Sequence, residues 1–247
     1  MAHAEPSILA VDAGNTRIKW GLHDLAVWRA RGVVPTTDAV HLKAQWHAAP
    51  RGTKVTVSNV AGPDVLAHIE RAAVECGFTC RVIRSEASQL GVTSGYDDPG
   101  QLGTDRWAAL VAAHRSMPGL KVVVNVGTAL TIDALTGDGR FLGGLIVPGP
   151  SLMRRSLDRG TAGLRLTEGV FQPFPASTPN AITTGAIQAC VGAVERVRRD
   201  MEAHGAPPLG MLLSGGGAME IAAYLPMPAT FNENLVLDGL VAIARET

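Results

Sequence analysis

The pattern of apolar and polar positions along the chain predicts short strands and helices in a regular order. The first of three consecutive runs near the start is almost entirely apolar, as a central strand would be, and the residues that follow it alternate between apolar and polar. We therefore expect a meander of three strands at residues 8–13, 16–23 and 26–34. Thr37 and Asp38 would then begin a helix that runs to about Ala48.

The alternation continues through the rest of the first half. Proline favours the first position of a helix, so Gly62 and Pro63 would begin one. The glycine-containing segment 86–102 is predicted to be a loop on the substrate side that crosses between two halves of the chain. The other elements that we expect here are strands at residues 53–59 and 79–83 and a helix at residues 103–115.

The second half of the chain repeats this order. Residues 161–179 read as a loop, and Thr178 and Pro179 would be the N-cap and the first position of a long helix. The other expected elements are a meander at about 121–147, a helix at 151–158, a buried strand at 211–214 and a closing helix at 234–245. Strands followed by helices, twice, predict an α/β fold.

One short motif occurs in both halves. An apolar run ends in Asp12, one residue intervenes, and Gly14 follows; the second copy ends in Asn125 and Gly127. A threonine comes shortly after each glycine, and each copy continues into further alternating residues. Two such units far apart in the chain indicate a duplicated domain with one turn from each half facing a shared cleft.

The first copy carries groups that suit a phosphate site. Gly14 can adopt a positive φ and so let the backbone fold closely around an anion. Asp12 would offer a hard oxygen ligand to Mg²⁺, and Lys19 a point charge. An ordinary hairpin is the alternative, because Gly-Asn is also a common turn dipeptide. The second copy of the motif favours the cleft.

Composition excludes several classes of protein. The chain has 247 residues, 46% of them apolar and 18% charged, so it can bury a sizeable core. Lys plus Arg and Asp plus Glu both number 22, and this balance gives no sign of nucleic-acid binding. No apolar run is long enough to span a membrane. Three cysteines without a CxxC pair, and a start without a signal peptide, predict a reduced cytoplasmic protein.

The sequence also lacks the motifs of several enzyme classes. There is no GxxxxGK[ST] phosphate loop, no complete GxGxxG fingerprint and no GxSxG nucleophile elbow. The seven histidines are scattered, without an HExxH motif or a paired Cys/His spacing, so no metal cage is expected.

Four motifs in order resemble those of the type III pantothenate kinases, which belong to the acetate and sugar kinase, Hsp70 and actin superfamily. The resemblance runs from residue 8 to about residue 240. The motifs are Asp12-Ala-Gly-Asn-Thr-Arg-Ile-Lys19, Gly103-Thr-Asp-Arg106, Gly127-Thr-Ala-Leu-Thr-Ile-Asp133 and Gly144-Leu-Ile-Val-Pro-Gly149.

The resemblance implies a duplicated ribonuclease-H-like (actin-like ATPase) fold with two halves around an ATP cleft. We place these halves at residues 1–117 and 118–247. It further implies a homodimer, ATP with Mg²⁺ as cofactor, and phosphorylation of pantothenate to 4'-phosphopantothenate at the start of coenzyme A biosynthesis.

Asp105 is the candidate general base of this reaction. Phosphoryl transfer needs positioning, charge neutralisation and a group that accepts the proton of the attacking hydroxyl. Asp105 lies just inside a predicted helix start, where the helix dipole alone could also explain an aspartate. The resemblance favours the catalytic interpretation. Arg106 would grip the pantothenate carboxylate, although a solvated helix arginine is the simpler alternative.

The resemblance also implies the other site residues. Tyr96, Gly103, Thr104, Asp105 and Arg106 would line the pantothenate site, although Tyr96 could instead be a packed loop residue. Thr178 would complete the site of the neighbouring subunit, and it could also serve as an N-cap. Gly215 to Gly217 resemble the glycine turn under the adenine. The predicted ATP ligands are Asp12, Ala13, Gly14, Asn15, Thr16, Arg17, Ile18, Lys19 and Thr128.

Asn125 departs from the family pattern. Many members have an aspartate there, and its carboxylate helps to bind a monovalent cation such as K⁺ or NH₄⁺. Asn125 keeps a carbonyl oxygen but loses the charge. We therefore expect a weaker need for this cation, or cation binding through backbone carbonyls.

Two other functions remain open at this stage. Another kinase of the superfamily could use the same turns on a different small molecule, but Tyr96 and the Gly103–Arg106 motif argue against it. A non-catalytic accessory factor for gene expression is possible, yet the neutral chain has no basic patch, and it carries Asp12, Lys19 and Asp105 together.

Overall fold

The computed structural model describes residues 7–160, 168–205 and 209–246 of the chain. These residues form two compact units. The first unit consists of the chain up to Ala113 together with the C-terminal segment from Leu235, and the second unit runs from His114 to Asn234.

The first unit is built on a five-stranded sheet with the strand order β3-β2-β1-β4-β5. The central strand β1 runs antiparallel to β2 and parallel to β4, so the sheet is mixed. The strands are β1 (Ile8–Ala13), β2 (Arg17–His23), β3 (Trp28–Pro35), β4 (Lys54–Asn59) and β5 (Thr79–Val82).

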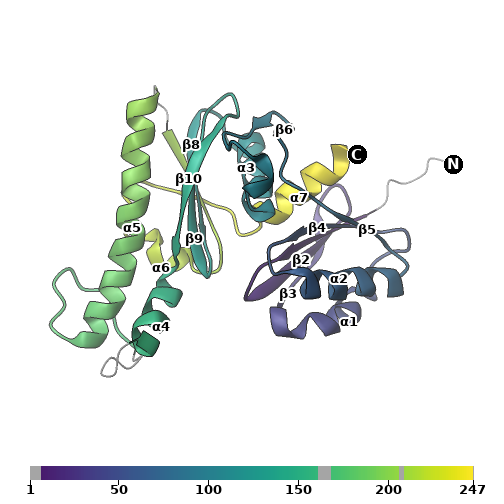
Figure 1. The fold of residues 1–247 in the computed structure, drawn as a ribbon, viewed down its shortest axis with the longest axis horizontal. Helices are drawn as coiled ribbons and strands as arrows, with labels where there is room; N and C mark the ends of the chain where they lie inside the picture. Colours follow the sequence, from purple (N-terminus) through teal and green to yellow (C-terminus); the bar gives the residue numbers. More distant parts are fainter. Residues whose placement is uncertain (1–6, 161–167, 206–208, 247) are drawn as a thin grey trace. The chain divides into compact units, whose positions relative to one another are not determined.

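Helices cover both faces of this sheet (Figure 1). The short α1 (Leu42–Trp46) and α2 (Pro63–Glu75) pack against one face of the sheet and share a hydrophobic core with it. On the other side, α7 (Leu235–Glu246) packs against β1 and lies directly on α3 (Thr104–Ser116). A Cβ on Gly239 of α7 would overlap the carbonyl group of Ala108 in α3, so glycine permits this backbone contact.

The alternation along the central strands decides which residues reach which face. In β1, Leu9, Val11 and Ala13 enter the core under α1 and α2. Asp12 therefore points to the opposite face, the one on which α7 packs. Its position is at the carboxyl end of the strand, where functional groups of parallel neighbours converge.

The second unit repeats this sheet. Its strand order is β10-β9-β8-β11-β12, which matches that of the first unit strand for strand, with the same mixture of antiparallel and parallel neighbours. The duplicated α/β fold is thereby confirmed. The strands are β8 (Leu120–Val126), β9 (Ala129–Leu135), β10 (Phe141–Pro148), β11 (Leu209–Ser214) and β12 (Thr230–Phe231).

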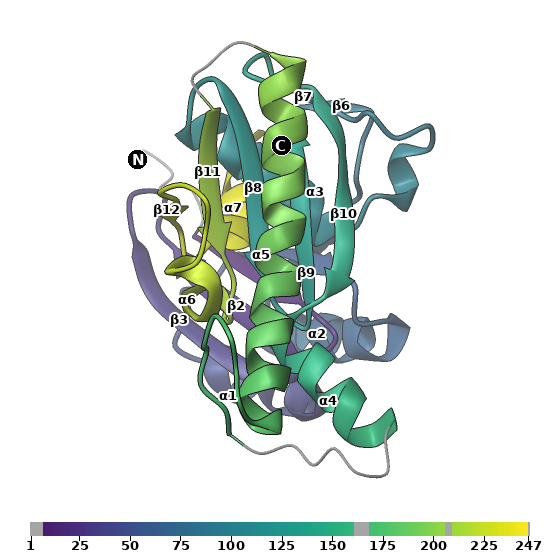
Figure 2. The same ribbon diagram turned by 90° about the vertical axis from the view of Figure 1, so that its left-hand side faces the viewer.

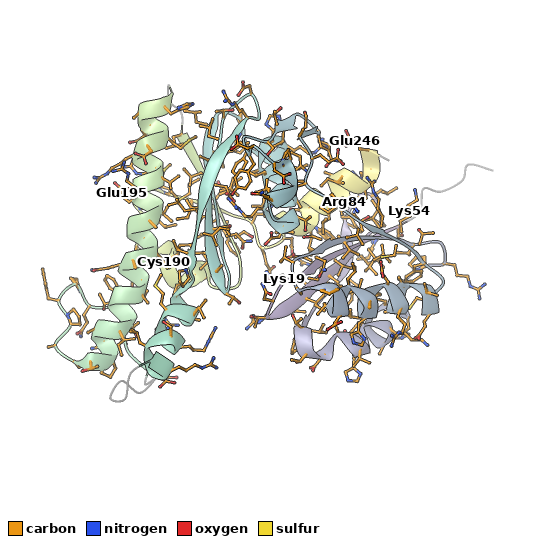
Figure 3. All side chains as sticks on the ribbon, in the orientation of Figure 1. Lys19, Lys54, Arg84, Cys190, Glu195 and Glu246 are labelled. Atoms are coloured by element: carbon orange, nitrogen blue, oxygen red, sulfur yellow. The ribbon has the colours of Figure 1, made fainter. Side chains whose placement is uncertain are left out.

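A long helix covers one face of the second sheet. Figure 2 shows α5 (Thr178–His204) lying across β8 and β9. Cys190 is on its buried side, whereas Glu195 pairs with Arg198 and Arg199 on the helix surface (Figure 3). Two shorter helices complete the unit, α4 (Pro150–Gly160) and α6 (Ala218–Ala222).

Several predicted elements differ in detail from the structure. The helix expected from Thr37 to Ala48 is a 3₁₀ segment, η1 (Thr36–His41), followed by the short α1. Thr178 is not the N-cap of α5 but its first helical residue, because Ser177 occupies the cap position with extended backbone angles. The predicted loop at 86–102 contains a two-stranded hairpin, β6 (Ser88–Gln89) and β7 (Val92–Thr93), and the turn η2 (Pro99–Gln101).

Part of the loop expected at 161–179, residues 161–167, lies outside the described residues. The short edge strand β12 had no sequence signal, because it pairs through only two residues. Within the part of the chain that the structure describes, no helix is both long and apolar enough to cross a membrane.

The compact units differ from the predicted halves at 1–117 and 118–247 in the place of the last helix. The sequence order puts α7 in the second half, whereas its apolar residues pack in the first unit. The boundary between the two duplicated halves at residues 117 and 118 therefore stays a prediction, whereas the two compact units are defined by the contacts within each unit.

Candidate active site

Three polar side chains form a row on the α7-facing side of the first sheet. Asp12 of β1 stands opposite Lys19 of antiparallel β2 and opposite Ser58 of parallel β4. Directly paired residues of neighbouring strands project to the same face. Lys19 lies near the start of β2 (Figure 3), and Ser58 is fully buried. The row thus combines a carboxylate, an ammonium group and a hydroxyl.

The turn between β1 and β2 is tight. The Gly14 N–H donates to the Arg17 carbonyl at 3.0 Å, and the Thr36 hydroxyl donates to the Gly14 carbonyl at 2.7 Å. The predicted positive φ of Gly14 is wrong, since Gly14 is not among the residues with left-handed backbone. Glycine is favoured there because a Cβ would lie 3.3 Å from the Arg17 carbonyl oxygen. Asn15, Thr16 and Arg17 are exposed at the tip.

The start of α3 lies beside the end of β4. The Thr104 and Ser58 hydroxyl oxygens are 2.9 Å apart and share a hydrogen bond. Gly103 precedes the helix, and a Cβ there would lie 2.6 Å from Oδ1 of Asp105. The same Oδ1 accepts a hydrogen bond from the Arg106 N–H at 2.8 Å. The glycine therefore leaves the space into which the Asp105 carboxylate folds back.

The Asp105 carboxylate is close enough to perturb the pKa of Asp12. Burial, and secondly the Asp105 charge, raise the pKa of Asp12 to about 7, although Lys19 acts in the opposite direction. Burial also raises the pKa of Asp105, against the hydrogen bond from the Arg106 N–H and the charge of its guanidinium. Two carboxylates with raised pKa values mark a place that favours an added cation.

Arg106 and Tyr96 form a second pair beside this carboxylate. Arg106 Nη1 donates to the Tyr96 hydroxyl at 2.9 Å, and the guanidinium carbon is 5.8 Å from the centre of the tyrosine ring. Arg106 is only 4% exposed, so the alternative of a solvated helix arginine is wrong. Tyr96 comes from the loop before α3 and is half-buried. The loop and the helix start are thereby joined.

The second unit carries a matching row. Asn125 of β8 stands opposite Thr131 of antiparallel β9 and opposite Ser214 of parallel β11. These positions correspond to Asp12, Lys19 and Ser58, so the second copy has lost both charges of the first.

The turn of the second copy is shorter than that of the first. Four residues separate the last strand pair of the first turn, Ala13 and Ile18, whereas three separate Val126 and Leu130. The Gly127 N–H donates to the Ala129 carbonyl at 2.9 Å. The Thr128 carbonyl accepts a hydrogen bond at 2.9 Å from the N–H of Gly149, just before α4. The second turn therefore packs against the start of that helix.

The predicted site residues fall into three groups. The first unit brings together Asp12, Lys19, Asp105, Arg106 and Tyr96, with Gly103 and Thr104 between them. Thr128 and Asn125 belong to the second unit, near the turn after β8. Thr178 is exposed in the first turn of α5.

Sequence reasoning missed Ser58. The signal was present, because Ser58 lies one residue before the end of the strand predicted at 53–59, and a parallel strand next to β1 would place it beside Asp12. The described residues contain no group of three or more His, Cys, Asp or Glu side chains that could hold a metal ion. A divalent cation at Asp12 would thus share its coordination with water or phosphate oxygens.

Comparison with solved structures identifies the fold. A polyphosphate/ATP-glucomannokinase from Arthrobacter covers 98% of this chain and 100% of its own, with a TM-score of 0.51 and 16% identity. The ADP-bound MreB5 of Spiroplasma citri matches with a TM-score of 0.53 over 98% of this chain and 97% of its own, at 10% identity. The fold is the duplicated ribonuclease-H-like fold of sugar kinases and actin-like proteins.

A Campylobacter jejuni structure described as a Baf family transcriptional activator matches with a TM-score of 0.62 and 20% identity, over 96% of this chain and 98% of its own. At 20% identity this likeness shows a shared fold and nothing about function.

Sequence comparison then identifies the family. The family model described as type III pantothenate kinase matches residues 8–200. The type III pantothenate kinase of Nitrosospira multiformis is 42% identical over 98% of this chain and 92% of its own length. That of Dechloromonas aromatica is 41% identical over 96% and 98%. The chain belongs to the type III pantothenate kinase family, and its enzyme class is that of the phosphotransferases.

Proposed function

We propose that this protein transfers the terminal phosphoryl group of ATP to the hydroxyl of pantothenate, which forms 4'-phosphopantothenate in the first step of coenzyme A biosynthesis. The observation that carries the proposal is the placement of Asp105 and Arg106 at the start of α3, next to Asp12 at the end of β1. The membership of this chain in the type III pantothenate kinase family supports pantothenate as the substrate.

Asp105 is proposed as the general base. One carboxylate oxygen, Oδ1, is engaged by the Arg106 N–H at 2.8 Å, which fixes the orientation of the group. The raised pKa of Asp105, caused chiefly by burial, makes its carboxylate a better proton acceptor than an exposed aspartate. The carboxylate would accept the proton of the pantothenate hydroxyl as that oxygen attacks phosphorus.

Asp12 is proposed as the residue that holds Mg²⁺, directly or through water. The donor set fits a hard cation, because the Asp12 carboxylate is held at a strand end close to a second carboxylate. When bound, Mg²⁺ would neutralise charge on the ATP phosphates. Lys19, the strand partner of Asp12, would contribute a further positive charge.

The two glycine turns are proposed to hold ATP. The turn from Ala13 to Lys19 exposes Asn15, Thr16 and Arg17, which can donate hydrogen bonds to phosphate oxygens. Thr128, in the turn of the second unit, would also contact ATP. Both turns close tightly at their glycine, because a Cβ would lie 3.3 Å from the Arg17 carbonyl oxygen at Gly14 and 3.4 Å from the Ala129 carbonyl oxygen at Gly127.

Pantothenate would bind along the loop and start of α3. Arg106 is buried and aligned by its hydrogen bond to Tyr96, so its guanidinium is preorganised to receive the substrate carboxylate. Gly103 and Thr104 would form the adjoining wall.

We also propose a homodimer in which Thr178 reaches the site of the neighbouring subunit. Thr178 is exposed at the start of α5. The segment before it presents two exposed apolar side chains, Phe174 at 95% and Val170 at 62%. Exposed aromatic and aliphatic side chains near a proposed contact support an interface between copies.

The monovalent cation is proposed to matter less in this protein than in relatives with an aspartate at the same position. Asn125 presents a neutral carbonyl oxygen, and it packs closely against the Gly215 backbone, where a Cβ would lie 2.6 Å from Asn125 Oδ1. A cation there would be held mostly by uncharged oxygens and hence weakly. We place the reaction in the cytoplasm, in keeping with three free cysteines.

The test is ADP release from MgATP with and without pantothenate, in K⁺ and in Na⁺ buffers, for the wild type and Asp105→Asn. We expect pantothenate-dependent ADP release that falls by at least ~10²-fold in the variant, with similar rates in the two buffers. An ADP release rate that is the same with and without pantothenate would refute the proposal that pantothenate is the substrate. A rate that collapses in Na⁺ and recovers at low K⁺ would refute the proposed cation independence.

A further inference from the structure

Ser58 is a buried hydroxyl in a place where an apolar residue would be simpler. It has 0% exposure and lies one residue before the end of β4. Buried hydroxyls are retained where they have hydrogen-bond partners. The partner of Ser58 is the Thr104 hydroxyl, 2.9 Å away, on the first residue of α3.

We propose that Ser58 is a positioning residue that holds the start of α3, and with it Asp105, against the strand end that carries Asp12. The inference rests on the proposed function in one respect, the role of Asp105 as general base. Ser58 itself touches neither substrate nor phosphate in this proposal, and it acts through Thr104.

Register explains why this serine is suited to the task. In the parallel pair of β1 and β4, Ser58 is the direct partner of Asp12, so both side chains emerge from the same face at the same height. Thr104 lies next in the chain to Asp105. The Ser58–Thr104 hydrogen bond therefore connects the neighbours of the two carboxylates over a short path.

The surroundings of Gly103 place the first turn of α3 next to the segment that follows β4. A Cβ on Gly103 would lie 2.6 Å from Asp105 Oδ1 and 3.9 Å from a methyl carbon of Val60, in the segment just after β4. The N–H of Trp107 donates to the Gly103 carbonyl at 2.9 Å as the first helical bond. The segment after β4 therefore lies beside the first turn of α3, and Ser58 adds a polar contact between β4 and this turn.

The duplication supplies a matched control. Ser214 occupies the equivalent place in the second unit, opposite Asn125 in the parallel pair of β8 and β11, and it is 2% exposed. The same change, serine to alanine, can therefore be made at two buried positions of the same strand register. The candidate base Asp105 lies beside Ser58, in the first unit.

The experiment compares steady-state kinetics of Ser58→Ala, Thr104→Val, Thr104→Ser and Ser214→Ala in the full chain with MgATP and pantothenate. We expect Ser58→Ala and Thr104→Val each to lower kcat by about 5- to 30-fold, with KM for ATP within about twofold of the wild type. A loss of this size corresponds to ~1–2 kcal/mol, typical of one hydrogen bond. Thr104→Ser keeps the hydroxyl and should restore most of kcat.

The double variant Ser58→Ala/Thr104→Val should be no slower than the slower single variant, because both changes break the same bond. Thermal melting accompanies each assay, and rates are measured well below the melting temperature. Ser214→Ala should leave kcat within about twofold of the wild type.

Three results would overturn the inference. Ser58→Ala with unchanged kcat, while Asp105→Asn is inactive, would refute the positioning role and leave the proposed base intact. An equal loss in Ser214→Ala would show that any buried serine of this type has the same effect. Full turnover by Asp105→Asn would remove the base assignment, and the positioning role would fall with it.

Discussion

Replacing Asp12 by asparagine should stabilise the first unit above neutral pH when no metal or nucleotide is present. The native pKa of Asp12 is about 7, against 3.8 for an ordinary aspartate, chiefly because the group is buried. Between these values the native state holds a proton that the unfolded state has lost. The free energy of unfolding therefore falls as the pH rises from about 4 to 7, and above pH 7 the full penalty is present.

The size of the effect follows from the shift. About three pKa units at 1.36 kcal/mol each give an upper bound of ~4 kcal/mol, which the Asp12→Asn variant would regain at pH 8. For a protein of this length, 1 kcal/mol corresponds to about 2–4 °C in melting temperature. At that upper bound the variant would melt about 8–16 °C above the wild type at pH 8, and only a few degrees above it at pH 4.5.

Tryptophan fluorescence measures this unit selectively. The protein has four tryptophans, and all of them, Trp20, Trp28, Trp46 and Trp107, lie in the first unit. Melting in EDTA at pH 4.5, 6 and 8 would give the pH dependence for wild type and variant. Excess Mg²⁺ should shrink the difference at pH 8, because the cation favours the ionised carboxylate.

Asp24 provides a control of opposite sign. Hydrogen bonds from the backbone N–H groups of Val27 and Ala26 lower the pKa of Asp24 to about 2. Its ionised form is favoured by folding, so Asp24→Asn should destabilise the protein above about pH 4 and have no effect near pH 2. If Asp12→Asn gained no more stability at pH 8 than at pH 4.5, the interpretation of Asp12 as a buried, destabilised carboxylate would be refuted.

Two further predictions concern packing and a buried charge. Gly239→Ala should lower the free energy of unfolding by about 1–3 kcal/mol, because the added methyl group overlaps the Ala108 carbonyl. Gly192→Ala, on the open surface of α5, should raise it by up to about 1 kcal/mol. Urea unfolding of both variants measures the two changes. Lys121 is 0% exposed, its Nζ has no hydrogen-bond partner within the described residues, and burial lowers its pKa. The unfolded state therefore holds the proton to higher pH, and stability should rise with pH in the alkaline range; Lys121→Met should abolish this slope and gain about 1–3 kcal/mol at pH 7, as measured by thermal melting.

The sequence predicted the elements that carry the site because their signals are local. The strand before Asp12, the repeated glycine turn and the helix start before Asp105 each depend on a few neighbouring residues. The reason given for Gly14 was wrong, since steric crowding by a carbonyl oxygen and a positive φ both favour glycine and the sequence does not distinguish them.

What the sequence did not predict depends on contacts between distant segments. The sequence left open whether Arg106 binds a carboxylate or is solvated, and its burial depends on a hydrogen bond to Tyr96, ten positions earlier. Ser58 acquired significance only through its register with Asp12 and its contact with Thr104. The packing of α7 on the first sheet likewise needs β1 and α3 to be in place.

The return of α7 to the first unit has a consequence for synthesis of the protein. The strands of the first sheet leave the ribosome early, but the helix that packs on β1 and α3 is encoded after the whole second unit. One face of that sheet therefore lacks α7 during the time in which the whole second unit is translated. A premature stop codon shortly before Leu235 would therefore damage the N-terminal unit rather than the C-terminal one, and the partly made chain would depend on chaperones at the face that carries Asp12.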